Sequence, residues 1–391
     1  MKTTFFKQIL IVMISIFFMA CPKPDDPINE DEEDKTYALE FDNWTYLDNL
    51  GEGEFSYKNV IYENSFYACT GKDGLYKMDL CNTSPHFEYL GLADSSGLYP
   101  PIWTISDVAI LYDTLLVARY YIRSAEVETT VGILKKIGDG PWAAFDAGIV
   151  DSTQQNESTI WGIKRSPHNP KILVAVGNGG AVFNSTTAGL DWTTEFSSLS
   201  LLGNGYKIIW HPENEGEIWK IGSSVFSSPI LIPSYDFGYE WDQEFMINLS
   251  PLGGDTHVYD LLFKKQNNNS MYMSSYYGVL YSDSAGSDWL NQGWYEDDAD
   301  EGYTKPPWIM EFEIDGPKYG GMTHIDEIPN QIFIAKGSVL YWSMNNGESF
   351  SEVNGPNEER IYSINYINVQ NILIAQTETG FYSLQVIINE N

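Results

Sequence analysis

Short runs of alternating apolar and polar residues recur along most of the chain after about residue 40. One copy shows every part: TIWGIKRS, the turn PHNP, KILVAVG, the turn NGG, and AVFNS. The runs are rich in β-branched and aromatic residues and are separated by Asn, Asp, Gly and Pro, which is typical of strands joined by turns. No helical period follows the N-terminal segment, so the pattern predicts an all-β protein.

Four of these copies lead into a similar octet. The octets STTAGLDW, SYDFGYEW, SDSAGSDW and SMNNGESF begin at Ser185, Ser234, Ser282 and Ser343. Each has a serine, a glycine four residues later and an aromatic residue at its end. Recurrence at roughly 50 to 60 residues indicates repeated structural units.

Related runs without an octet extend the series to seven copies. SYKNVIYENSFYACTGKDGLYK and WTISDVAILYDTLLVARYY precede the octet-bearing copies, and IYSINYINVQNILIAQTETGFYS comes after them. Seven four-stranded units predict one β-propeller, which protects its strand edges by arranging blades around an axis. The last copy stops before a fourth strand, and Phe41 to Leu47 resembles the segment that comes after an octet. We therefore predict that this N-terminal segment closes the last blade of a propeller spanning residues 39–391.

The octet resembles the Asp-box, or BNR, repeat of sialidases, sortilin-type receptors, photosystem II assembly factors and some endoglucanases. In that family the box is a structural turn between the third and fourth strands, on the outer lower rim. An Asp or Asn side chain can accept backbone N–H bonds there, Gly can take positive φ, and the last aromatic residue packs between sheets. Thr187 and Ser284 depart from the expected acidic or amide residue. The resemblance implies structural roles for Ser185, Gly189, Trp192, Ser234, Asp236, Gly238, Trp241, Ser282, Gly286, Trp289, Ser343, Asn345, Gly347 and Phe350.

The N-terminus has the pattern of an export signal. Lys2 and Lys7 precede the apolar run Ile9 to Phe18, so residues 1–20 are interpreted as a signal peptide, with a plain membrane anchor as the alternative. The ending FMAC resembles a bacterial lipobox, although Phe18 replaces the usual Leu, and implies lipidation of Cys21. Residues 21–38 are acidic and poor in apolar residues, which predicts a disordered tether. They resemble the surface-export signal of Bacteroidetes lipoproteins, which implies an outer-membrane lipoprotein on the cell surface or the periplasmic side.

The net charge and the absence of known binding motifs exclude several classes of partner and cofactor. The formal net charge is −32, with 22 Lys and Arg against 54 Asp and Glu, which argues against nucleic acid and leaves membrane contact to the lipid anchor. The sequence contains no CxxC or Cys/His cluster, phosphate loop or Ser-His-Asp motif, so we expect no metal and no cofactor. Cys69 and Cys81 are either a disulfide or two buried thiols, although the turn GKDG places Cys69 opposite Tyr76.

A ligand is expected on the upper face, where loops leading into the inner strands meet loops joining second and third strands. Aromatic faces with polar neighbours suit sugar rings or peptide side chains, whereas aromatic wedges between blades are the alternative. A long connection, residues 293–321, is expected to wall this face, with the acidic run Glu296 to Glu301 solvated. The candidate ligand-binding residues are Trp103, Tyr120, Tyr121, Arg123, Trp161, Tyr206, His257, Tyr276, Tyr277, Trp308 and His324.

Catalysis is the competing interpretation. Sialidases with this repeat clamp a carboxylate with three arginines. This chain has four arginines, Arg119, Arg123, Arg165 and Arg360, with Arg165 expected at the lower end of its strand and no FRIP-like motif. An endoglucanase needs two opposed carboxylates, for which Asp255 and Glu378 are candidates. The missing motifs favour a glycan- or protein-binding or scaffold module over a glycoside hydrolase, with a purely structural envelope protein as a third option.

Overall fold

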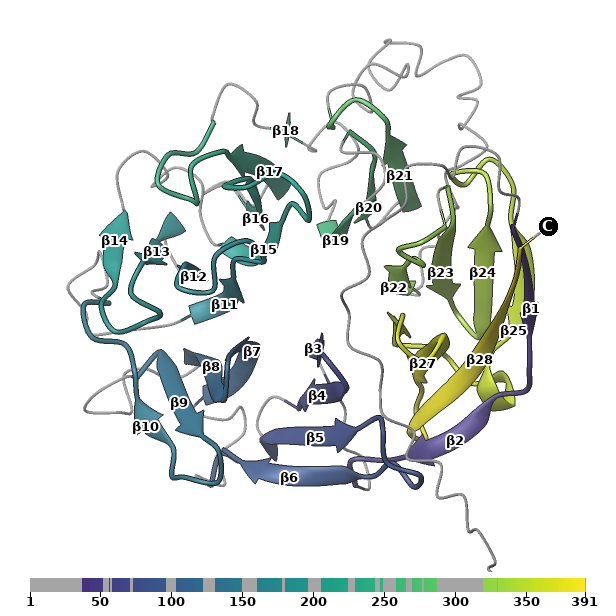
Figure 1. Ribbon diagram of the computed structural model, residues 1–391, viewed down its shortest axis with the longest axis horizontal. Coiled ribbons are helices and arrows are strands. Elements are labelled where there is room, and N and C mark those ends of the chain that lie inside the picture. The colour runs from purple at the N-terminus through teal and green to yellow at the C-terminus, as the bar shows by residue number, and fades with distance from the viewer. Residues whose placement is uncertain are drawn as a thin grey trace, which may run out of the picture.

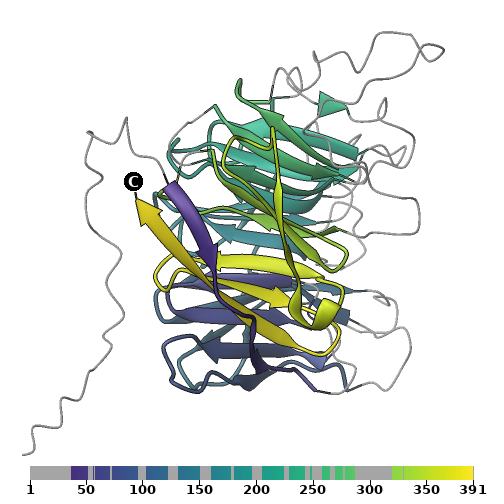
Figure 2. The same cartoon turned by 90° about the vertical axis from the view of Figure 1, so that its right-hand side faces the viewer.

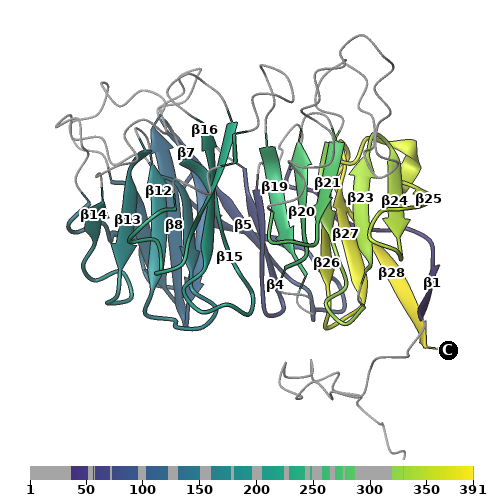
Figure 3. The same ribbon diagram turned by 90° about the horizontal axis from the view of Figure 1, so that it is seen from above.

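The computed structural model describes residues 37–51, 56, 58–70, 73–95, 103–121, 131–149, 160–177, 180–195, 205–223, 229–242, 247–248, 258–264, 269–275, 278–286, 319–328 and 330–390. Within these ranges the chain forms seven antiparallel sheets arranged as blades in a ring (Figure 1). Seen from the side, the blades form a disc whose strands run between its two faces (Figure 3). The seven-bladed propeller predicted from the sequence is confirmed. We call the face where the inner strands begin the upper face.

Blades 1 to 4 succeed one another along the chain, each from its inner strand outward. Blade 1 contains β3 (Lys58–Tyr62), β4 (Ser65–Cys69), β5 (Leu75–Asp79) and β6 (Phe87–Gly91). Blade 2 contains β7 (Trp103–Leu111), β8 (Thr114–Tyr121), β9 (Ile133–Ile137) and β10 (Ala143–Ala144). Blade 3 contains β11 (Ile160–Arg165), β12 (Leu173–Gly177), β13 (Val182–Ser185) and β14 (Thr193–Glu195). Blade 4 contains β15 (Gly205–Trp210), β16 (Ile218–Ser223), β17 (Pro229–Ser234) and β18 (Ile247–Asn248).

Blades 5 to 7 complete the ring. The described part of blade 5 contains β19 (Val258–Phe263), β20 (Met271–Ser275) and β21 (Gly278–Ser282). Blade 6 contains β22 (Tyr319–Thr323), β23 (Ile332–Lys336), β24 (Val339–Ser343) and β25 (Ser351–Asn354). Blade 7 contains β26 (Ser363–Ile367), β27 (Ile372–Gln376) and β28 (Phe381–Glu390). A single-turn 3₁₀ helix, η6 (Pro356–Glu358), precedes blade 7, and no helix in the described ranges is long and apolar enough to cross a membrane.

The N-terminal segment closes the ring against β28. Two strands pair with it, β1 (Tyr37–Phe41) along its second half and β2 (Thr45–Asp48) along its first half. Figure 2 shows β1 and β28 side by side on the outside of the disc. Closure by this segment is as predicted, but the single strand expected from Phe41 to Leu47 is divided in two.

Apolar clusters fill the spaces between successive blades. Between blades 7 and 1, the Phe381 ring lies edge-on to Phe66 and Phe87, with ring centroids 5.5 Å and 4.8 Å away. Such aromatic pairs contribute about 0.5–1.5 kcal/mol beyond area burial. Middle strands such as β12 are buried along their whole length because a blade packs on each side. This explains why the middle strands read as continuous apolar runs rather than as alternating ones.

The cysteine question is settled for Cys69. Its thiol is free and fully buried, and burial raises its pKa to about 12. Cys69 faces Leu75, and Tyr76 faces Ala68, so the predicted register was wrong by one residue. The Cys69–Cys81 disulfide left open by the sequence is therefore not formed.

Candidate functional site

A buried carboxylate joins three inner strands around the axis. Asp107 is fully buried on β7, directly after a bulge, and its Oδ2 lies 2.7 Å from Nζ of Lys58 in blade 1. Its Oδ1 lies 3.2 Å from Nζ of Lys164 in blade 3. The backbone N–H groups of Val108 and Ile163 donate to the same carboxylate at 2.8 and 3.1 Å. These four donors satisfy the carboxylate and connect blades 1, 2 and 3.

The charges of this network act on one another. Burial opposes ionisation of Asp107, but Lys164, Lys58 and the hydrogen bonds together hold its pKa below the usual value. Burial lowers the pKa of Lys58 to about 8, with Asp107 opposing the shift and Lys164 and Lys207 adding to it. Lys207 in turn donates to Asp260 of blade 5 at 2.5 Å. Because each lysine has a carboxylate partner, we interpret the network as a structural link between inner strands.

An aromatic pair lies on the upper face between blades 2 and 3. Tyr120 is next to the end of β8 and Trp161 is next to the start of β11, so both reach the same face of the disc. The rings stack with their centroids 3.8 Å apart and their planes at 28°, and both residues are half-buried. Nearby, Ser106 Oγ donates to the carbonyl of Ile160 at 2.5 Å, which fixes the two blades at this point. Aromatic rings on a loop-bearing face are candidates for contact with sugar rings and peptide side chains.

Tyr121 does not join this surface. Its side chain is buried, its hydroxyl accepts the backbone N–H of Val131 at 3.0 Å, and the Arg119 guanidinium lies 5.4 Å from its ring. Successive residues of a strand point to opposite faces of the sheet, so Tyr120 and Tyr121 cannot both face one ligand. The prediction that Tyr121 binds ligand is therefore not supported by its burial.

His324 lies at the wrong end of the disc for the predicted ring. The inner strand β22 ends at Thr323, so His324 comes after it on the lower side, where its Nε2 lies 3.2 Å from Asp326 Oδ1. The sequence prediction placed His324 near the start of this strand, but the strand begins at Tyr319 and ends before His324. Assigning His324 to the upper face was wrong.

The other predicted ligand residues are only partly described. Trp103 and Tyr206 lie at or next to the starts of β7 and β15, on the upper side, as far as their backbone is described. The remaining predicted residues fall outside the described residues, as does the run Glu296 to Glu301: Arg123, His257, Tyr276, Tyr277 and Trp308. The site predictions at these positions stay predictions.

The described arginines are dispersed. Three guanidinium groups lie over three different tyrosine rings, Arg119 over Tyr121, Arg165 over Tyr62 and Arg360 over Tyr362. Arg165 is the last residue of β11 and so lies at the lower end of its strand. No three-arginine clamp forms among these three residues, and no group of three or more potential metal ligands gathers in the described ranges.

The four octets form one type of turn on the lower outer rim. Each begins at the last residue of a third strand, and each serine Oγ accepts the N–H of the glycine four residues later at 2.8–2.9 Å. The glycines all have positive φ, between 82° and 86°. The serine–glycine pairs are Ser185 with Gly189, Ser234 with Gly238, Ser282 with Gly286, and Ser343 with Gly347.

The third and last positions of the octets can also be compared. Asp236 Oδ1 accepts the N–H of Glu240 at 2.8 Å, Asn345 Oδ1 accepts that of Ser349 at 3.0 Å, and Thr187 Oγ1 accepts that of Asp191 at 2.9 Å. Threonine therefore makes the same type of bond as the acidic and amide residues. The aromatic residues Trp192, Trp241 and Phe350 belong to clusters between adjacent blades, and Trp289 lies outside the described residues.

Comparison with known proteins identifies the fold. No protein-family model matches the chain, and no curated protein matches it in sequence. A solved structure of YCF48 bound to D1 peptide matches with a TM-score of 0.55 and 13% identity, covering 89% of this chain and 98% of that one. The GH74 xyloglucanase from Xanthomonas campestris matches with a TM-score of 0.57 and 14% identity, covering 88% and 53%. The GH74 enzyme from Niastella koreensis matches with a TM-score of 0.56 and 15% identity, covering 87% and 53%.

These matches establish a shared propeller architecture. At such low identity they carry no residue-by-residue correspondence of function. The chain spans about half the length of the two GH74 chains and nearly the whole of the YCF48 chain.

Proposed function

We propose that this protein is a binding or scaffold module whose upper propeller face holds a glycan or protein ligand. The observation that carries the proposal is the Tyr120–Trp161 stack, with ring centroids 3.8 Å apart on the upper rim between blades 2 and 3. Aromatic residues are enriched among the contacts that dominate binding energy, and their faces suit both sugars and peptides.

The setting of the stack supports this function. The Ser106 bond to Ile160 and the Asp107 network beneath it fix blades 2 and 3 relative to each other. A rigid platform binds with a smaller loss of conformational freedom than a mobile one. The similarity to YCF48 bound to D1 peptide adds support for a peptide ligand, because in both cases one propeller accounts for nearly all of the aligned chain.

The proposed subcellular location is the outer membrane, on the cell surface or the periplasmic side. Signal cleavage before Cys21, lipidation of that cysteine, a tether over residues 21–38 and membership of the Asp-box family together form this part of the proposal. The supporting features are the lipobox-like FMAC, the acidic residues after Cys21 and the four similar octet turns. Metabolic labelling with a palmitate analogue tests the lipidation, because Cys21→Ser should abolish labelling.

The ligand site is tested with Trp161→Ala against Trp142→Ala. Both tryptophans are half-buried, but Trp142 lies beside the outer strand of blade 2, where its Nε1 donates to Leu90 O. On a glycan array and in peptide capture from envelope extracts, we expect Trp161→Ala to weaken binding at least about 30-fold, the effect of losing about 2 kcal/mol at a binding hot spot. Trp142→Ala should bind as the wild type does. Equal binding by all three proteins would remove the proposed site.

A glycoside hydrolase is the competing function. It predicts new reducing ends when the wild-type protein is incubated with polysaccharides, whereas a binding module releases none. Such release would replace the proposal.

A further inference from the structure

The octet of blade 4 differs from the other three in side chains but not in backbone. Its second, fourth and sixth positions are the aromatic residues Tyr235, Phe237 and Tyr239. The other octets have Thr, Asp or Met at the second position, Ala or Asn at the fourth, and Leu, Ser or Glu at the sixth. All four make the same serine–glycine hydrogen bond, so the turn itself forms without aromatic residues at these positions.

The exposure of the two tyrosines indicates that they have a use beyond folding. Tyr235 is 54% exposed and Tyr239 is 38% exposed, which places both phenol groups in reach of a partner. Phe237, by contrast, has a packing role: it lies against the apolar cluster between blades 3 and 4, with its ring centroid 6.3 Å from that of Trp210. Exposed aromatic groups that the fold does not need are typical of interaction surfaces.

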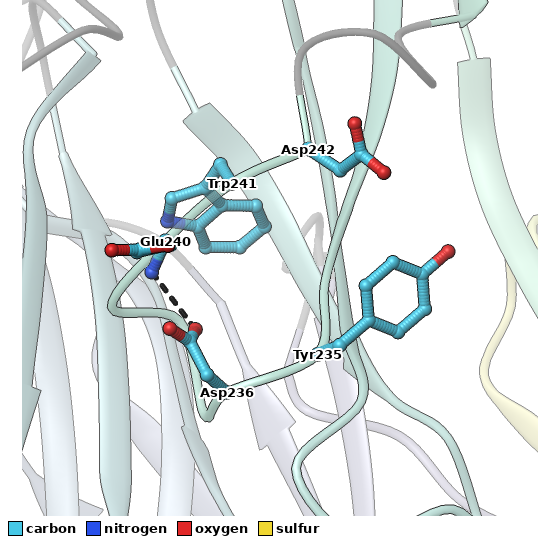
Figure 4. A pocket seen from close by; sticks show the side chains of 5 residues that line it. All are labelled: Tyr235, Asp236, Glu240, Trp241 and Asp242. Atoms are coloured by element: carbon cyan, nitrogen blue, oxygen red, sulfur yellow. Dashed lines mark hydrogen bonds between the residues drawn. The ribbon is translucent and has the colours of Figure 1, made fainter.

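The blade 4 octet also lines a pocket of about 330 Å³. Figure 4 shows its lining, with Tyr235 and Asp242 on one side, Asp236 and Glu240 on the other, and the Trp241 indole between them. Asp236 is engaged by the turn, but Glu240 is exposed at the rim. Partial burial raises the pKa of Tyr235, and the negative charges of Glu217 and Asp242 add to the rise.

We propose that this pocket is a docking site for a basic segment of a partner protein, with one Lys or Arg side chain over the Tyr235 ring between Glu240 and Asp242. Charge complementarity carries the assignment, since three carboxylates line the pocket and the whole chain has a formal charge of −32. A cation over an aromatic face and beside carboxylates is a favourable arrangement. The pocket volume suits one side chain rather than a folded domain.

This site is separate from the proposed upper-face site. The octet turn lies at the lower end of the third strand, whereas Tyr120 and Trp161 lie on the upper face. Both faces can therefore be occupied at the same time, and the docking proposal does not rest on the function of the upper face. If both proposals hold, the protein is a scaffold that binds a ligand above and a basic partner segment below.

The other octets provide matched controls. Tyr235→Thr and Glu240→Gln alter the pocket at the second and seventh octet positions. Met344→Thr in blade 6 is the control for Tyr235→Thr, at the same octet position. Asp191→Asn in blade 3 is the control for Glu240→Gln, since both remove one negative charge at the seventh octet position. The probe is a capped six-residue peptide of alternating glycine and arginine, with its glutamate counterpart as a negative control, and titration calorimetry at low salt is the readout.

We expect the wild-type protein to bind the arginine peptide and not the glutamate peptide. Tyr235→Thr and Glu240→Gln should each weaken binding about fivefold or more, and Met344→Thr and Asp191→Asn should leave it unchanged. Binding should also weaken as NaCl is raised. Thermal unfolding of each variant establishes that it is folded.

Three results would overturn the proposal. No binding of the arginine peptide by the wild-type protein removes the site. Equal affinity in all variants shows diffuse attraction to the acidic surface instead of a pocket. Binding of a neutral oligosaccharide that is lost in Tyr235→Thr, with no arginine-peptide binding, makes the pocket a sugar site.

Discussion

Two fully or largely buried lysines, Lys58 and Lys220, have the same lowered pKa of about 8 but different surroundings. Lys58 lies on an inner strand, where Asp107 of the next blade is 2.7 Å from its ammonium group. Lys220 lies on β16, opposite Ile208 and Ile232, on the face of blade 4 that packs against blade 3. Its described partner is one carbonyl, that of Gly180, at 3.5 Å.

The difference shows that burial alone does not decide whether a charged side chain stabilises or destabilises the folded protein. Burial lowers the pKa of both lysines, but for Lys58 the attraction of Asp107 opposes this and the repulsion by Lys164 and Lys207 adds to it. For Lys220 burial is the whole cause. A buried charge with a carboxylate links two blades, whereas a buried charge with one long carbonyl contact destabilises the interface in which it lies.

Removing the shared carboxylate should have the largest effect. Asp107→Ala leaves the ammonium groups of Lys58 and Lys164 together without their partner, and we expect the free energy of unfolding to fall by about 3 kcal/mol at neutral pH. Urea denaturation at pH 7 measures the loss. A change of less than about 1 kcal/mol would show that water compensates these lysines and that the network is not a link between blades.

Removing the ammonium group of Lys220 should stabilise the folded protein. Lys220→Met replaces a buried charge with an apolar side chain of similar length, and we expect the free energy of unfolding at pH 7 to rise by about 1–3 kcal/mol. The control is Lys77→Met, on the half-buried strand β5 of blade 1. Destabilisation by Lys220→Met would mean that the carbonyl bond outweighs the desolvation of the charge.

The pH dependence of stability tests whether the buried charge of Lys220 destabilises the folded protein. Its pKa is about 8 in the folded protein and about 10.5 when unfolded, so below pH 8 both states are protonated and the destabilisation is fully present. Between pH 8 and 10.5 the folded state loses its proton first, and the stability of the wild type relative to Lys220→Met should rise by up to about 3 kcal/mol. Unfolding curves of both proteins between pH 7 and 10 test this, and a constant difference would contradict it.

The smallest effect is expected for one lysine of the paired network. Lys58→Met leaves Asp107 with Lys164 and two backbone N–H groups, and it removes the repulsion among the lysines. We expect the free energy of unfolding to change by no more than about 1 kcal/mol. A double-mutant cycle with Asp107→Ala measures the coupling, and a loss as large as that of Asp107→Ala alone would make Lys58 the essential partner.

Most of the fold could be predicted from local sequence features. The alternation of apolar residues, the polar turns and the four octets determine strand order, and the unfinished last copy indicated that an N-terminal strand is needed to close the ring. The stacked pair Tyr120 and Trp161 was also among the predicted ligand residues. The strand and turn features depend on residues close together in the chain, so a single sequence contains them, whereas the stacking of Tyr120 on Trp161 joins two blades.

The incorrect or missing site predictions concern positions where turn signals in the sequence were weak or where residues of several blades meet. The start of β22 comes after a long connection, and His324 was assigned to the wrong end of its strand. Tyr121 was counted with Tyr120 because both are tyrosines, although strand alternation separates them. Asp107 was not singled out at all, since an acidic residue in the apolar run TISDVAIL has no visible partner in the sequence.

The amino-acid sequence alone specifies the all-β class, the number of blades and the closure, because strand period and turn chemistry act over a few residues. Which charges meet is visible only in the folded protein, because Asp107 and Lys164 are 57 positions apart in the chain and become neighbours through the packing of two blades. The same holds for the isolation of Lys220, since apolar residues of its own blade and of the preceding blade together surround it. Contacts between blades depend on how whole sheets pack, and no local pattern encodes that packing.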